Sequence, residues 1–100
     1  MVVDHELNEL KREFLDEALE KVTEIQTALD HVDDQESRER VAYLAHQLKG
    51  SGGSYGYQRI STDAAALEKC VESPSLDEPR IQQYVVSLRS EIHRAAKELA

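Results

Sequence analysis

The apolar residues of this sequence recur every three or four positions over most of its length, which is the spacing of one face of an α-helix. The first such stripe contains Leu7, Leu10, Phe14, Ala18, Val22, Ile25 and Leu29. Charged side chains fill the positions between them, and Glu17 and Lys21 have the i,i+4 order that supports a helix. We therefore predict an amphipathic helix over residues 7–29, followed by a polar connection over residues 30–35.

Three further segments have the same periodicity. Their apolar positions are Val41, Leu44, Leu48 and Tyr55 in the second, Ile60, Ala64, Leu67, Cys70 and Val71 in the third, and Ile81, Tyr84, Val85, Leu88, Ile92, Ala95, Ala96 and Leu99 in the fourth. Gly56 is expected to end the second helix, Pro74 to end the third, and Asp77 to cap the fourth at its N-terminus. No segment alternates with a period of two. The pattern predicts an all-α fold, an antiparallel four-helix bundle with up-down-up-down topology.

Length and charge narrow the possible functions. One hundred residues predict a single domain spanning residues 1–100. The formal net charge of -8 argues against nucleic acid and anionic membranes as partners, because both require a basic surface. A single cysteine fits a reducing compartment, and the sequence has neither a signal peptide nor an apolar run that could span a bilayer. We expect a cytoplasmic monomer.

The second predicted helix contains an unusual cluster of glycines. All four glycines of the chain lie within residues 50–56. Each glycine inside a helix costs about 1 kcal/mol relative to alanine. A sequence that keeps Gly50, Gly52 and Gly53 in this helix therefore requires bare backbone there, either for close packing or for access.

A helical wheel separates these two uses. With about 100° per residue, His46 lies on the opposite side of the helix from the apolar stripe. Gly50 and Gly53, one and two turns later, lie on the same side as His46, and so does Ala42, one turn earlier. Lys49 lies beside them, whereas Gly52 falls on the core side. The pattern predicts an exposed imidazole on a patch cleared of large side chains, with one cation next to it.

Few chemistries suit this arrangement. A metal site would need more ligands on this face, so no metal is expected. A hydrolytic site would need a nucleophile and a pocket, and a phosphate-binding loop would need free amides at a helix N-terminus. An exposed neutral imidazole has a free lone pair and can attack phosphorus when the active site of another protein closes over it. Lys49 can then offset the negative charge of the bound phosphoryl group.

The residues around His46 carry a family resemblance. The run His46-Gln47-Leu48-Lys49-Gly50, with Tyr55-Gly56 after it, resembles the H-x-L-K-G pattern of the histidine-containing phosphotransfer (HPt) domain of two-component phosphorelays. The later Ala66-Leu67-Glu68 is similar to a small-Leu-Glu element in the following helix of that family. The resemblance covers essentially the whole chain, and its specificity lies between His46 and Gly56.

The resemblance implies a role for each of these residues. His46 would accept a phosphoryl group, at Nε2, from the aspartate of one receiver domain and pass it to another, with Lys49 assisting. Gly50 and Gly53 would give steric access, and Gln47 would flank the site. The partners implied are the receiver domains of response regulators and of hybrid histidine kinases. The Mg²⁺ for transfer belongs to the receiver, so no cofactor is implied. The resemblance also implies a phosphotransfer intermediate without a kinase or ATP-binding domain.

Two alternatives remain open. The phosphoacceptor segment of a sensor kinase usually has an acidic residue directly after the histidine, where this chain has Gln47. A helical docking module could bind a receiver or a kinase without transferring phosphate.

Residues 38–59 contain four basic side chains and one acidic side chain, a net charge of +3, while the rest of the chain carries a net charge of -11. We therefore also predict a locally basic docking face, which suits the acidic active sites that the resemblance implies for receivers.

Overall fold

Four helices make up most of the structure, a computed structural model that describes residues 2–31 and 33–99. They are α1 (Val2–Leu29), α2 (Gln35–Ser54), α3 (Gln58–Glu72) and α4 (Glu78–Leu99). The predicted connection over residues 30–35 includes Val32, which lies outside the described residues.

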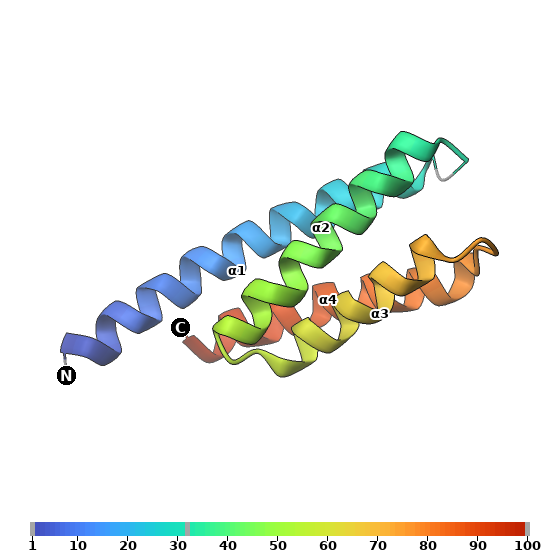
Figure 1. The fold of residues 1–100 in the computed structure, drawn as a ribbon. Helices are drawn as coiled ribbons and strands as arrows, with labels where there is room; N and C mark the ends of the chain where they lie inside the picture. Colours follow the sequence, from blue (N-terminus) through green and yellow to red (C-terminus); the bar gives the residue numbers. More distant parts are fainter. Residues whose placement is uncertain (1, 32, 100) are drawn as a thin grey trace.

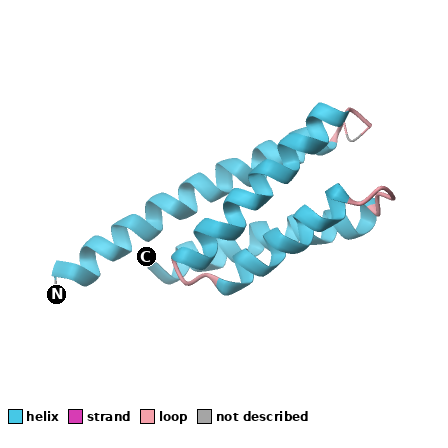
Figure 2. Ribbon diagram, viewed as in Figure 1, coloured by secondary structure: helices cyan, strands magenta, loops and turns pink. Residues whose placement is uncertain are grey.

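The helices are arranged as a square bundle. α1 packs on α2 and α4, and α3 packs on the same two helices, so that neighbours in the chain are neighbours in space. The chain runs along the bundle and back twice (Figure 1). Colouring by secondary structure shows helices and short loops, with no strand among the described residues (Figure 2). The predicted all-α, up-down-up-down four-helix bundle is confirmed.

The core consists of apolar side chains from all four helices. Its buried members are Phe14, Leu15, Ala18, Val22, Ile25, Leu29, Val41, Leu44, Ala45, Leu48, Ile60, Ala64, Leu67, Val71, Ile81, Val85, Leu88, Ile92 and Ala95. Most of them belong to the predicted stripes. Leu7 and Leu10 differ from the prediction, because they are 42% and 48% exposed. They lie where the N-terminal part of α1 extends beyond the other helices (Figure 1).

The helix ends follow from local sequence. Asp77 caps α4 as predicted, since its Oδ1 accepts a hydrogen bond from the backbone N–H of Arg80 at 3.2 Å. α2 begins at Gln35, the last residue of the predicted connection, because Asp34 caps it by accepting from the N–H of Glu36 at 3.1 Å. Ser73 has extended backbone angles before Pro74, and α3 ends there.

The turn from α2 to α3 brings these two helices close together. Gly56 has a φ of 83°, which glycine adopts without strain. The N–H of Gly56 bonds the carbonyl of Gly53 at 3.1 Å, and the N–H of Tyr57 bonds the carbonyl of Gly52 at 2.8 Å. This pair of bonds is a Schellman motif, and it ends α2 where the sequence predicted.

Gly52 lies at a close contact between α2 and α3. A Cβ added there would lie 3.2 Å from Cγ2 of Ile60 and 3.2 Å from the backbone nitrogen of Ser61. One of these neighbours is backbone and cannot move aside easily. Gly52 is buried, so the close packing predicted for it is confirmed.

Two glycine substitutions should therefore have opposite effects on stability. We expect Gly52→Ala to lower the free energy of unfolding by about 1–3 kcal/mol, as overpacking does. Gly50→Ala should raise it by about 0.4–1 kcal/mol, because a Cβ at Gly50 has no neighbour within 4 Å and alanine restricts the unfolded chain. Urea unfolding followed by circular dichroism measures both. Equal destabilisation by the two substitutions would contradict the different roles assigned to these glycines.

Candidate functional site

α2 presents His46 to the solvent. Leu44, Ala45 and Leu48 on the other side of the helix are buried in the core, which fixes the rotation of α2. The His46 side chain is 64% exposed as a result. The outward orientation predicted from the helical wheel is confirmed.

Glu68 on α3 holds the imidazole of His46. Its Oε2 lies 3.1 Å from Nδ1 of His46, and its Oε1 lies 3.3 Å from Nζ of Lys49. The Glu68 side chain is only 16% exposed, so packing limits its freedom. One carboxylate therefore binds both the histidine and the lysine of the predicted site.

This contact determines the position of the ring proton. An ionised carboxylate only accepts hydrogen bonds, so the hydrogen between Glu68 and His46 belongs to Nδ1. In a neutral imidazole the other nitrogen, Nε2, then has a free lone pair. The site thus presents an oriented imidazole with its outer nitrogen available as a nucleophile.

α2 and α3 are also tied together next to this contact. The hydroxyl of Ser61 donates to the backbone carbonyl of Lys49 at 2.9 Å. Leu67, directly before Glu68, is fully buried and fixes the rotation of α3. The position of Glu68 relative to His46 therefore depends on the packing of the two helices and not on the conformation of a loop.

A hollow of about 510 Å³ lies beside His46 between α1 and α2. It is lined by Lys21, His46, Gln47, Gly50, Ser51, Ser54 and Tyr55. Gly50 is exposed, with open space where a side chain would be. Gln47 donates a hydrogen bond to the hydroxyl of Tyr43 at 2.9 Å, which orients its amide along α2. Three of the residues next to the imidazole, Gly50, Ser51 and Ser54, are therefore small.

Three of the predicted site residues do not line this hollow. Lys49 is one of them, and it is bound to Glu68. A Cβ on Gly53 would be 3.6 Å from Oγ of Ser61, so Gly53 faces α3. Ala42 is half-buried and lines a different hollow, of about 450 Å³, together with Arg38 and Val71. The structure thus groups Gly50 and Gln47 with His46 at the hollow and joins Lys49 to His46 through Glu68, whereas Ala42 and Gly53 do not line the hollow.

The predicted basic face needs correction. Three of the four cations in residues 38–59 pair with carboxylates on neighbouring helices. The pairs are Arg40–Glu24 at 2.5 Å, Lys49–Glu68 at 3.3 Å and Arg59–Glu91 at 3.5 Å. The hydrogen bond from Arg40 also lowers the pKa of Glu24. A net charge counted along the sequence therefore overstates the positive charge of the folded surface, because the acidic partners come from other segments.

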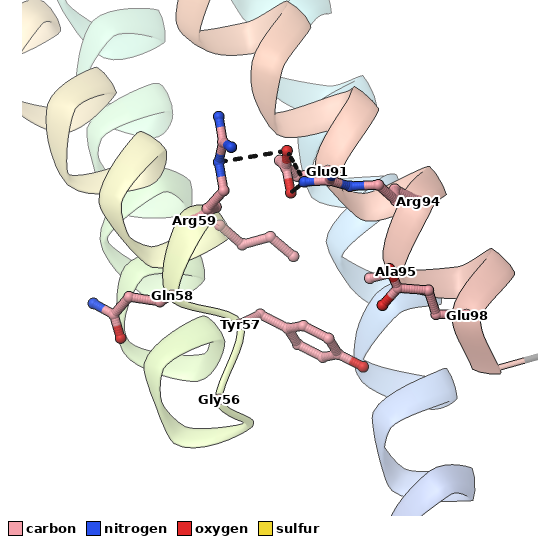
Figure 3. Close-up of a pocket in the computed structure, with 9 residues that line it drawn as sticks. Gly56, Tyr57, Gln58, Arg59, Glu91, Arg94, Ala95 and Glu98 are labelled. Carbon is pink, nitrogen blue, oxygen red and sulfur yellow. Dashed lines mark hydrogen bonds and ion pairs between the residues drawn. The ribbon is translucent and has the colours of Figure 1, made fainter.

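A separate hollow of about 330 Å³ lies between the α2–α3 turn and α4 (Figure 3). Arg59 and Arg94 both pair with Glu91, at 3.5 Å and 2.7 Å. Tyr57 also lines it, and burial raises the pKa of Tyr57. Neither His46 nor Glu68 lines this hollow, so it is not part of the candidate site.

Comparison with known proteins shows the family to which the chain belongs. The family model described as Hpt domain matches residues 9–98. The chain belongs to the Hpt family. No curated protein and no solved structure gave a significant match. Hpt domains act in phosphorelays as phosphocarriers and not as kinases, and the family interacts with receiver domains.

Two further features of this Hpt domain concern membranes and metal ions. None of its helices, within residues 2–31 and 33–99, is long and apolar enough to cross a membrane. The same part of the chain holds no group of three or more side chains that could bind a metal ion.

Glu68 is the site residue that the sequence interpretation did not assign. Its signal was the Ala66-Leu67-Glu68 element, which was noted only as part of the resemblance. Glu68 lies 22 residues after His46, so no local sequence pattern predicts their contact. Only the packing of α3 on α2 brings the two side chains together.

The role of Glu68 predicts a measurable change in the imidazole. In the neutral imidazole we expect the ring proton of His46 to be on Nδ1, because Oε2 of Glu68 lies 3.1 Å from this nitrogen. Glu68→Ala should remove this preference, because the acceptor is gone, whereas Glu72→Ala, an exposed position on the same helix, should not. Long-range ¹H–¹⁵N NMR of the ring reports the tautomer. A proton predominantly on Nε2 in the unsubstituted chain would show that Glu68 does not orient the ring.

Proposed function

We propose that this Hpt domain is a phosphocarrier that accepts a phosphoryl group on His46 from the aspartate of one receiver domain and passes it to the aspartate of another. The observation that carries the proposal is the contact between Glu68 Oε2 and His46 Nδ1, at 3.1 Å. It supports a nucleophilic Nε2 on an imidazole that is 64% exposed.

The transfer step follows from this orientation. The lone pair of Nε2 attacks the phosphorus of the aspartyl phosphate, a P–N bond forms, and the P–O bond to the aspartate breaks. The aspartate leaves as a carboxylate and keeps the electron pair of that bond. The proton on Nδ1 stays in place, so the ring becomes positively charged, and the carboxylate of Glu68 stabilises that charge. Transfer to the next receiver is the same step in reverse.

The neighbours of His46 have distinct parts in this proposal. Lys49 neutralises the second oxygen of Glu68 and keeps the carboxylate oriented. Gly50 leaves open the space through which the receiver reaches Nε2. Gln47 lines the approach. The roles predicted for Ala42 and Gly53 remain predictions, since both lie toward α3.

The wider assignment is also a proposal. We infer that residues 1–100 act as one domain, as a monomer in the cytoplasm. The partners are receiver domains of response regulators and of hybrid histidine kinases. A docking module that binds a receiver without phosphotransfer has the same fold, and the next experiment separates the two functions.

Labelling from a phosphorylated receiver domain tests the proposed function. We expect the chain to acquire an acid-labile, base-stable label, and His46→Gln to lose it with unchanged helicity. His93→Gln, at an exposed position on α4, is the matched control and should label normally. Equal labelling of His46→Gln would refute the assignment, and binding without any label in the unsubstituted chain would favour the docking module.

Access to Nε2 predicts a steric effect at Gly50. Gly50→Leu should leave the bundle folded but slow transfer by about tenfold or more, since displacing reacting groups by about 1 Å costs on the order of 100-fold. Gly50→Ala adds only a methyl group and should slow transfer much less. Both rates come from quenched-flow transfer from the same phosphorylated receiver. Unchanged transfer in Gly50→Leu would rule out the role of Gly50 in access.

A further inference from the structure

One cation that lines the hollow beside His46, Lys21, takes part in none of the ion pairs described above. Lys21 on α1 is half-buried and lines the same hollow as His46 and Gly50. The sequence predicted that it pairs with Glu17, but no ion pair within 4.0 Å joins Lys21 to any carboxylate of the described residues. Lys49, by contrast, is bound to Glu68.

The direction of the imidazole makes the position of Lys21 important. Glu68 approaches His46 from α3 and occupies Nδ1. Nε2 is on the part of the ring turned away from that contact, and the hollow that His46 lines lies between α2 and α1. The carboxylate of Glu68 keeps Lys49 on the α3 side. Lys21 is therefore the lysine that lines the hollow beside His46.

The reaction requires positive charge on that side. An aspartyl phosphate is anionic, and a carboxylate remains on the receiver after transfer, so both reactants and products bring negative charge toward His46. α1 is otherwise acidic here, because Glu17, Glu20 and Glu24 line the adjoining hollow together with Lys21. Arg40 neutralises Glu24 but not the other two. Without Lys21 an anionic receiver site would approach a mostly negative surface of α1.

We propose that Lys21 is a docking residue for the anionic active site of the receiver, which approaches His46 from the side of α1 and α2. This inference rests on the proposed phosphotransfer function. It assigns Lys49 to the positioning of Glu68. It assigns to Lys21 the contact with the anionic site of the receiver, whereas the sequence predicted that Lys49 offsets the charge of the phosphoryl group on His46.

Transfer kinetics with matched variants test this assignment. With the phosphorylated receiver that labels the unsubstituted chain, we expect Lys21→Gln to raise KM about two- to fivefold at low salt, as loss of one exposed ion pair would. The maximal rate should stay unchanged, and the difference should disappear at about 1 M salt, where charges are screened. Lys21→Arg should restore KM. Lys97→Gln on α4 removes the same charge from an exposed position outside the hollow and should change neither parameter.

The outcomes separate this inference from the function on which it rests. If the unsubstituted chain takes no label, the proposed function itself fails. If it labels and Lys21→Gln keeps the unsubstituted KM at low salt, only the role of Lys21 is wrong. The hydrolysis rate of the isolated phosphorylated chain should not change in Lys21→Gln. A faster hydrolysis with unchanged KM would place Lys21 against the phosphoryl group of His46 and would overturn its assignment to receiver docking.

Discussion

The site depends on one shared carboxylate, that of Glu68, which binds Nδ1 of His46 with one oxygen and Nζ of Lys49 with the other. Because His46 and Glu68 belong to different helices, this contact exists only while α2 and α3 keep a fixed spacing. Gly52 permits that spacing, since a side chain there would meet Ile60 and the backbone of α3. The Schellman turn and the Ser61–Lys49 hydrogen bond keep it in place.

Gly52 and Gly50 both lower the helix propensity of α2, and each has a different role that accounts for this cost. Gly52 serves the packing that positions Glu68, and Gly50 serves access to the nitrogen that Glu68 leaves free. The charged side chains near the site also divide into two groups, those paired within the bundle and those without such a pair. Most cations near the site are paired within the bundle, as Arg40 is with Glu24 and Lys49 with Glu68. What a partner meets is then set by the few charges without such a pair and not by the net charge of -8.

Periodicity was enough to predict the four helices, their order and the outward orientation of His46, because these depend on residues close together in the sequence. Gly56 and Asp77 were predicted correctly for the same reason, since turns and caps are local. The N-cap of α2, Asp34, was not assigned, because the sequence pattern places it within the polar connection over residues 30–35. The partner of His46 was not assigned, because a contact between residues 46 and 68 depends on how α3 is rotated against α2. The basic face was overestimated for a related reason, since the pairing carboxylates lie on other helices.

Whether Glu68 directs the chemistry of His46 can be tested on the phosphorylated protein itself. NMR coupling between ³¹P and the ring ¹⁵N nuclei identifies which nitrogen carries the phosphoryl group. We expect phosphorus on Nε2 and hydrogen on Nδ1, with the Nδ1 proton still bonded to Glu68. A phosphoryl group on Nδ1 would contradict this expectation, because that nitrogen would have to leave the carboxylate that the packing of α2 on α3 places against it.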